Sequence, residues 1–198
     1  MNLALFDFDG TITDSDTWTP FMRLAVPRAK VLASVVPMLP TFVGYRLGLV
    51  SASSARQMAM KLGFRGQSAN AVRQLGTDYA ARVIPGTLQP RALDRIEWHR
   101  SQGDHIVVVS GSLNVYLGPW CESQGIDCIC TTLEEQNGGL TGQLVAGDCS
   151  GAEKARRIRN RYDLTRYAVI YAYGDTTEDR EMLDLAHKKY YRWKEIPS

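Results

Sequence analysis

The chain has 198 residues, of which 44% are hydrophobic and 22% are charged. These values indicate one globular core with a modest second unit, and they exclude both a disordered chain and two independent enzymes. The net charge of +2 comes from 23 basic and 21 acidic residues, which is too even a balance to indicate a nucleic-acid partner. Met1 leads directly into an apolar run without the basic start of a signal peptide, so we expect a cytoplasmic protein.

The amino-terminal part begins with one strand and continues with helices. The apolar run at 3–6 has no polar alternation, which is typical of a strand buried on both faces. The segment 16–84 has no strand pattern of comparable strength, and its periodicity predicts helices at 54–62 and 68–84. The Pro-Gly pair at 85–86 then breaks the chain, so the helical segment is predicted to be an insertion after the first strand.

The remainder of the chain alternates strands with helices. Apolar runs at 106–109 and 168–173 predict two more buried strands. We expect a hairpin between residues 131 and 145, built around an Asn-Gly-Gly turn and lying beside the sheet. Helices are expected at 91–102, 113–124, 152–162 and 178–186. This alternation predicts an α/β fold with a parallel sheet.

Polar residues follow each of the three predicted strands. Asp7 and Asp9 follow the first strand, Ser110 and Gly111 the second, and Asp175 the third. Because ligands of open α/β sheets bind beyond the carboxyl ends of the strands, we expect these residues to converge. The strand period of two places Asp7 and Asp9 on one side, so one carboxylate could attack phosphorus while the other transfers protons. A phosphate dianion repels a carboxylate, and such a site therefore needs a divalent cation and a fixed positive side chain.

Four motifs in this order resemble the haloacid dehalogenase superfamily. They are Asp7-Phe8-Asp9-Gly10-Thr11, Ser110 after a valine strand, Lys154, and Gly174-Asp175-Thr176-Thr177-Glu178-Asp179. The long helical insertion resembles the cap of the phosphoserine phosphatase branch, subfamily IB, so the resemblance covers nearly the whole chain. It implies a Rossmann-like parallel sheet core at 1–15 and 85–198, with an inserted helical cap at 16–84. It also implies a magnesium-dependent phosphatase of a small phosphate monoester.

The resemblance implies a catalytic role for five residues. Asp7 would be the nucleophile that forms an aspartyl-phosphate, and Asp9 would be the general acid and base. Ser110 and the Gly111 amide would bind the transferring phosphoryl group, and Lys154 would neutralise charge on the nucleophile and the phosphate. Considered without the resemblance, Lys154 sits in a run of arginines, for which a solvated helix face is the usual interpretation.

The resemblance further implies a site for Mg²⁺, a hard cation that prefers oxygen ligands. The Asp7 carboxylate, the Asp9 backbone carbonyl and Asp175 would hold the ion, and Asp179 would support the ligand geometry. Asp179 could instead only favour the positive end of the following helix. Ser112 is expected to cap the helix that begins near residue 113.

The cap should decide the substrate. The early cap position that is glutamate in the phosphoserine phosphatases corresponds to Asp16, whose shorter side chain weakens the case for amino-group recognition. Arg56 or Lys61 could supply the cation that binds a substrate carboxylate. Phosphoserine is therefore one candidate substrate.

The span 31–50 is apolar, with Arg46 as its only charged residue. Its length approaches the roughly 20 residues that cross a bilayer, but Pro37, Pro40 and Gly44 disfavour a continuous spanning helix. We favour this span as the buried core of the cap. The alternative is docking at a membrane surface, which would favour a phospholipid head group such as phosphatidylglycerophosphate as substrate.

Two further functions belong to other classes: a phosphotransferase, and a non-catalytic protein that binds a phosphometabolite. The presence of both Asp7 and Asp9 disfavours the second, because a pseudoenzyme is expected to lose one of them. A phosphotransferase would place the phosphate on an added alcohol instead of releasing it to water.

Overall fold

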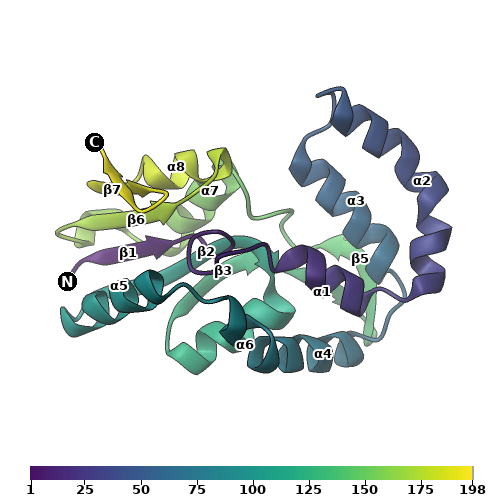
Figure 1. Ribbon diagram of the computed structural model, residues 1–198, viewed down its shortest axis with the longest axis horizontal. Helices are drawn as coiled ribbons and strands as arrows, with labels where there is room; N and C mark the ends of the chain where they lie inside the picture. Colours follow the sequence, from purple (N-terminus) through teal and green to yellow (C-terminus); the bar gives the residue numbers. More distant parts are fainter. Residues whose placement is uncertain (198) are drawn as a thin grey trace.

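The computed structural model describes residues 1–197 and has an α/β architecture around one mixed, mostly parallel sheet (Figure 1). The strand order is β3-β2-β1-β6-β7-β8, and β8 pairs with β7 in the antiparallel direction while the other neighbours pair in parallel. The strands are β1 (Leu3–Phe6), β2 (His105–Leu113), β3 (Asp127–Thr131), β6 (Ile170–Gly174), β7 (Lys188–Tyr191) and β8 (Lys194–Ile196). The predicted Rossmann-like sheet is confirmed.

Helices cover both faces of this sheet. They are α5 (Pro90–Ser101) and α6 (Asn114–Gln124) on one face, and α7 (Ala152–Arg161) and α8 (Arg180–Leu183) on the other (Figure 1). Because side chains alternate along a strand, Ala4 and Phe6 of β1 pack in the first layer while Leu3 and Leu5 pack in the second. Burial on both faces explains the unbroken apolar run of β1.

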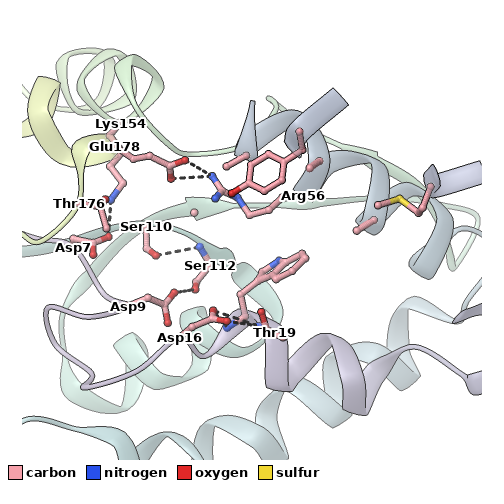
Figure 2. A pocket seen from close by; sticks show the side chains of 17 residues that line it. Asp7, Asp9, Asp16, Thr19, Arg56, Ser110, Ser112, Lys154, Thr176 and Glu178 are labelled. Carbon is pink, nitrogen blue, oxygen red and sulfur yellow. Dashed lines mark hydrogen bonds and ion pairs between the residues drawn. The ribbon is translucent and has the colours of Figure 1, made fainter. Parts of the chain in front are cut away.

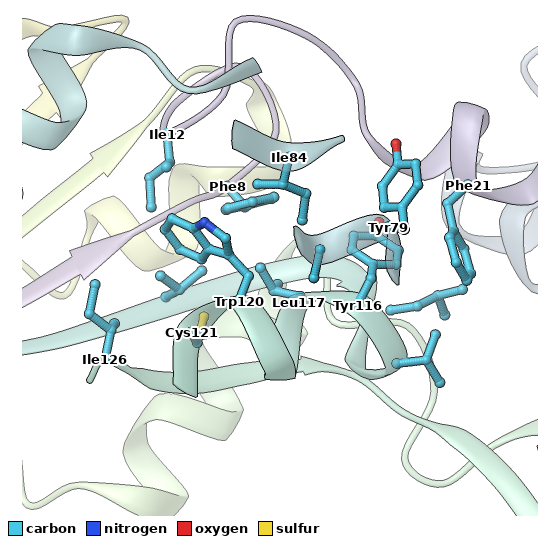
Figure 3. Packing of buried hydrophobic residues seen from close by; sticks show 14 of the residues in the cluster. Phe8, Ile12, Phe21, Tyr79, Ile84, Tyr116, Leu117, Trp120, Cys121 and Ile126 are labelled. Carbon is cyan, nitrogen blue, oxygen red and sulfur yellow. The ribbon is translucent and has the colours of Figure 1, made fainter. Parts of the chain in front are cut away.

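Four helices lie between β1 and α5. They are α1 (Trp18–Ala25), α2 (Arg28–Arg46), α3 (Ala52–Phe64) and α4 (Ala69–Arg82). Ser51 and Ser68 cap α3 and α4, and each side chain accepts a hydrogen bond from the backbone N–H three residues later. The rings of Phe21 and Tyr79 from this insertion contact Tyr116 of α6 in tilted and edge-on geometry. The base of the insertion therefore belongs to the same hydrophobic cluster as the sheet layer (Figure 3). The domain boundaries near residues 16 and 84 stay a prediction.

The predicted hairpin is formed by β4 (Leu133–Gln136) and β5 (Gly139–Leu144). Asn137 and Gly138 in its turn have φ values of 53° and 75°. The hairpin is a separate two-stranded sheet, and it exchanges backbone hydrogen bonds with residues 66–69, in the turn after α3 and at the start of α4. It therefore contacts the inserted helices as well as lying beside the main sheet.

Three expectations differ from the structure. Strands β3, β7 and β8 were not predicted, and the helix expected at 178–186 is only a 3-10 turn (Thr177–Asp179) followed by the short α8. The prediction that 31–50 forms the buried core of the cap is wrong, because α2 buries none of its residues. Its valines and leucines are exposed, and only a narrow stripe of the helix is half-buried.

Candidate active site

The carboxyl ends of three neighbouring strands bring the first and last motifs together. Phe6 in β1 pairs with Val108 of β2 and with Tyr173 of β6, so Asp7 emerges between the two neighbouring strand ends. The Asp7 backbone N–H donates to the Tyr173 carbonyl at 2.9 Å, which fixes the point where the chain leaves the sheet. This is the edge of the sheet at which the sequence predicted the site.

Gly10 makes the turn after Asp9 possible. Its φ is 79°, and a Cβ at this position would lie 2.4 Å from Asp175 Oδ2. A side chain would therefore be strained by the backbone and would also collide with the Asp175 carboxylate. The glycine of the first motif is what allows the last motif to approach.

Lys154 joins two carboxylates of the site. It lies in the first turn of α7, is only 3% exposed, and its Nζ is 2.6 Å from Asp7 Oδ1 and 2.6 Å from Asp179 Oδ1. Burial opposes its charge, but Asp7 and Asp179 hold the pKa of Lys154 above its ordinary value. Lys154 therefore points into the site, and the interpretation of its helix as a solvated basic face does not apply to this residue.

Asp7 and Asp179 differ in their supply of hydrogen-bond donors. Lys154 contacts one oxygen of Asp7, and burial raises the pKa of Asp7 well above its ordinary value. The second oxygen of Asp179 accepts hydrogen bonds from the backbone N–H groups of Asp175 and Thr176 and from the Thr176 hydroxyl. Although burial opposes it, Lys154 holds the pKa of Asp179 below its ordinary value. Asp179 is thus a fixed anion, whereas Asp7 keeps one oxygen without a donor among residues 1–197.

Asp9 is held on two sides. Its Oδ1 accepts hydrogen bonds from the Thr17 backbone N–H at 2.7 Å and the Thr17 hydroxyl at 2.6 Å, and its Oδ2 accepts one from the Ser112 hydroxyl at 2.5 Å. Burial raises the pKa of Asp9, and these hydrogen bonds partly counter the rise. The expectation that Ser112 caps the next helix is wrong, because α6 has Leu113 at its N-cap position and no side-chain cap.

Ser110 and Gly111 lie at the end of β2 beside the carboxylates. The buried Ser110 Oγ accepts a hydrogen bond from the Ser112 N–H at 3.0 Å, which leaves the Ser110 hydroxyl proton available to a ligand. Gly111 lies close to Asp148, whose Oδ1 would be 3.3 Å from a Cβ at position 111. Both residues line the same cavity as Asp7 and Asp9.

A cluster of carboxylates could hold a cation. One oxygen from each of Asp7, Asp175 and Asp179 lies within 4.8 Å of the others. Burial raises the pKa of Asp175, and the nearby Asp179 adds to this rise, so a divalent cation would relieve the repulsion between them. Hard oxygen donors of this kind fit Mg²⁺. Because the oxygens of Asp179 already accept hydrogen bonds, the arrangement fits Asp179 in a supporting position better than as a ligand.

The cavity above these residues has a volume of about 580 Å³, within the range of small-molecule sites. Figure 2 shows Asp7, Asp9 and Ser110 on one side of it and Arg56 of α3 on the other. Its polar lining includes Asp16 and Arg56, whereas the exposed Lys61 does not line it.

The two cap residues in the cavity have partners within the protein. The Asp16 carboxylate accepts hydrogen bonds from the backbone N–H groups of Trp18 and Thr19 at the start of α1. Arg56 donates to Asp148 at 2.8 Å and to Glu178 at 2.9 Å. Both side chains therefore have structural roles whether or not they touch a substrate.

Sequence reasoning missed Thr17 and the apolar wall of the cavity. Thr17 lies eight residues after Asp9, and the fold of the connecting loop, which no spacing rule predicts, brings it back to that carboxylate. The cap side of the cavity is lined mainly by apolar residues, namely Trp18, Met38, Tyr45, Ala52, Ala55 and Ala59. For Met38 and Tyr45, the high apolar content of 31–50 was the available signal.

Comparison with known proteins places this site in a family. The family model of haloacid dehalogenase-like hydrolases matches residues 4–184. Protein CicA of Caulobacter vibrioides is 28% identical over 197 residues, covering 96% of this chain and 85% of CicA. A structure of a protein of unknown function from Bordetella pertussis Tohama I has a TM-score of 0.79 at 20% identity, covering 96% of this chain and 89% of that one. A phosphoserine phosphatase, solved as a phospho-aspartyl intermediate analogue, has a TM-score of 0.66 at 19% identity, with coverage of 96% and 85%. The chain belongs to the haloacid dehalogenase-like hydrolase family.

Proposed function

We propose that the protein is a magnesium-dependent phosphatase that hydrolyses a phosphate monoester through an aspartyl-phosphate on Asp7. The observation that carries this proposal is the position of Lys154 Nζ, 2.6 Å from both Asp7 Oδ1 and Asp179 Oδ1. This arrangement fixes Oδ1 of Asp7, and Oδ2 has no hydrogen-bond donor among residues 1–197. We therefore assign Oδ2 as the nucleophile in the cavity that Asp7 lines.

In the first step, Asp7 Oδ2 attacks phosphorus and the bond from phosphorus to the leaving oxygen breaks. Asp9, whose pKa is raised by burial, donates its proton to that oxygen, and the alcohol departs. Lys154 and the Ser110 hydroxyl, which line the same cavity, would stabilise the charge on the phosphoryl oxygens. The products of this step are the free alcohol and the phosphorylated Asp7.

In the second step, the Asp9 carboxylate takes a proton from a water molecule whose oxygen attacks phosphorus. The bond from phosphorus to Asp7 breaks, and inorganic phosphate leaves the regenerated carboxylate. Thr17 and Ser112 hold Asp9 in one orientation through both proton transfers.

The Asp7 carboxylate, the Asp9 backbone carbonyl and Asp175 would hold the magnesium ion. The Asp179 carboxylate, which accepts a hydrogen bond from the Asp175 backbone N–H, would orient Asp175. The bound ion supplies positive charge that keeps Asp7 ionised and offsets its repulsion from the phosphate dianion.

The cap side of the cavity favours a substrate with an apolar part over a zwitterionic amino acid. Recognition of phosphoserine requires groups for its ammonium and its carboxylate. In this chain Arg56 is already paired with Asp148 and Glu178, and Asp16 accepts hydrogen bonds from α1. The neighbouring wall, which includes Met38 and Tyr45, offers apolar contact instead.

The test is hydrolysis of p-nitrophenyl phosphate in ¹⁸O-labelled water, with and without magnesium, by the full chain and two variants. We expect one labelled oxygen per released phosphate, no turnover by Asp7→Asn, and accumulation of phosphorylated protein in Asp9→Asn, whose aspartyl-phosphate hydrolyses slowly. Full activity of Asp7→Asn would overturn the proposal. Transfer of the phosphate to an added alcohol in preference to water would favour the phosphotransferase, and binding of phosphate esters without any turnover would favour the non-catalytic protein.

A further inference from the structure

Helix α2 exposes an apolar surface that the fold does not cover. Ten of the sixteen large hydrophobic residues exposed in the structure lie between positions 31 and 49. Leu32, Val36 and Leu49 are the most exposed of them, at 73%, 78% and 79%. Eight of the ten lie in α2, and Leu47 and Leu49 lie in the turn after it. A contiguous exposed apolar patch of this kind marks an interaction site.

An ordinary amphipathic helix turns its apolar side chains toward the protein, but α2 exposes most of its apolar side chains to solvent. Its half-buried positions between Lys30 and Gly44 are Ser34, Met38 and Thr41, spaced three or four residues apart, and its valines and leucines lie on the remaining surface. In Figure 1, α2 is the outermost helix of the insertion, beyond α3 and away from the sheet. The surface turned away from the protein is therefore the more apolar one.

The insertion also carries an unbalanced charge. Residues 17–77 contain eight basic side chains and no acidic one, whereas the rest of the chain contains fifteen basic and all 21 acidic side chains. Four of these basic residues flank or belong to α2: Arg23, Arg28, Lys30 and Arg46. An apolar surface bordered by cations complements a bilayer, whose interior is apolar and whose head groups can be anionic.

We propose that the outer face of α2 docks on an anionic phospholipid bilayer and that the enzyme takes its phosphate monoester from that surface. The substrate class, a lipid phosphate monoester, rests on the proposed phosphatase function. Met38 and Tyr45 of α2 line the same cavity as Asp7, so the docking helix forms one wall of the candidate active site. A lipid chain leaving the cavity would meet this apolar wall first.

A bilayer fits these features better than a second copy of the chain. A twofold interface through α2 would bring two surfaces with the same excess of positive charge together, which disfavours association. Among the described residues, no single helix is long and apolar enough to cross a membrane, although α1 and α2, bent by 117°, pass the same criterion as a pair. We therefore place α2 in the plane of the lipid head groups.

The test is sedimentation of the full chain with vesicles of phosphatidylcholine, either alone or with about 30% phosphatidylglycerol. We expect the wild type to bind the anionic vesicles. Val36→Asp should bind them about tenfold more weakly, because it puts a charge on the face that would enter the bilayer. Val145→Asp is the matched control, since Val145 is also exposed, at 64%, but lies after β5. We expect it to bind as the wild type does. Leu32→Asp should repeat the Val36→Asp result.

Three outcomes would overturn the docking proposal. They are equal binding of the wild type to both vesicle types, wild-type binding by Val36→Asp, and self-association in solution that Val36→Asp abolishes without any vesicle binding by the wild type. Turnover of p-nitrophenyl phosphate separates this proposal from the phosphatase itself. Val36 does not line the cavity, so its variant should hydrolyse this soluble ester at the wild-type rate while losing at least about tenfold in kcat/KM for phosphatidate in anionic vesicles. Absence of turnover in the wild type would contradict the phosphatase and leave the vesicle result to decide docking.

Discussion

The Ser112 hydroxyl lies 2.5 Å from Asp9 Oδ2, on the side of the carboxylate opposite Thr17. Ser112 is itself held by Tyr116, whose hydroxyl donates to Ser112 Oγ at 2.8 Å. In the proposed mechanism Asp9 acts first as a general acid and then as a base, so it has to keep one position through two proton transfers. Ser112 therefore acts as a positioning residue for Asp9.

We expect Ser112→Ala to lower kcat about tenfold, since a poorly oriented acid and base transfers protons less efficiently. The lost hydrogen bond also raises the pKa of Asp9, so the limb of the pH profile that reports Asp9 should move to higher pH. Steady-state kinetics on p-nitrophenyl phosphate would measure both effects. Ser123→Ala on α6 is the control, because its hydroxyl donates to the Trp120 carbonyl and accepts from the Gln124 side-chain amide, both in its own helix. A kcat equal to the wild type would show that Thr17 alone positions Asp9.

Asp179→Asn should weaken metal binding more than it lowers the maximal rate. Asp179 accepts hydrogen bonds from the backbone N–H of Asp175 and from Lys154, so its loss would disturb the proposed metal ligand Asp175 without removing it. We expect the magnesium concentration for half-maximal activity to rise about 10- to 100-fold. A magnesium titration would measure this, with Asp184→Asn on the protein surface as the control. An unchanged magnesium requirement would limit Asp179 to a local structural role.

The sequence predicted the polar ends of three strands but not how the neighbouring loops return to them. Asp7, Ser110 and Asp175 were predictable because buried strands are recognisable and their carboxyl ends share one edge of a parallel sheet. Thr17 and Ser112 were not, because their contacts with Asp9 depend on the conformation of a loop and on the irregular end of β2.

The error at α2 has a different cause. An apolar pattern predicts that a segment is removed from water, but it does not say what covers it. In α2 the protein covers only a narrow stripe, and residues such as Val36 remain exposed. The prediction assumed that the fold itself supplied the covering, which the structure contradicts.

Arg56 connects the inserted helices to the catalytic loops, and its removal should loosen that connection. Its guanidinium bonds the Asp148 carboxylate through Nε at 3.1 Å and Nη2 at 2.8 Å, and the Asp148 side chain has no exposed surface. We expect Arg56→Ala to reduce the free energy of unfolding by about 1–3 kcal/mol, because it leaves a buried carboxylate with fewer partners. Hydrogen exchange should become faster in α2 and α3.

Arg73→Ala is the matched control for Arg56→Ala. Arg73 pairs with Glu135 across the surface between α4 and the hairpin, where both side chains are exposed. Such a pair contributes at most about 1 kcal/mol, so chemical denaturation should barely detect its loss. Equal destabilisation by the two variants would mean that Arg56 is only a surface charge.

His99 should make the stability of the sheet layer depend on pH near neutrality. It is fully buried, its Nδ1 lies 2.8 Å from Asp104 and its Nε2 lies 3.0 Å from the Tyr173 hydroxyl. Burial lowers the pKa of His99 below the 6.5 of an ordinary histidine. The unfolded chain therefore binds this proton more readily, and the stability that the neutral ring contributes is present above about pH 6.5 and is lost as the pH falls.

The measurement is urea unfolding of the wild type and His99→Gln between about pH 7.5 and pH 5.5. The wild type should lose more stability across this range than the variant, whose side chain does not titrate. Parallel curves would contradict the assignment, because carboxylates common to both proteins would then account for the whole pH dependence.

Two glycines in helices should respond in opposite directions to the same substitution. A Cβ on Gly76 of α4 would lie 2.1 Å from the Val115 carbonyl oxygen, so α4 and α6 touch through backbone at this position. Gly76→Ala must separate the two helices and should cost about 1–3 kcal/mol of unfolding free energy. Beyond its two chain neighbours and the backbone of α6 itself, a Cβ on Gly118 would meet no atom within 4 Å, so Gly118→Ala should add up to about 1 kcal/mol through helix propensity.

Urea denaturation of both glycine variants would measure these changes. Because α4 belongs to the insertion and α6 to the sheet layer, the Gly76→Ala result reports directly on how tightly the two are joined. A loss at Gly76 together with a gain at Gly118 would establish that the inserted helices are seated on α6 by close backbone contact. If Gly76→Ala were neutral, α4 would have to be free to shift against α6, and the cavity wall that the insertion builds over Asp7 would shift with it.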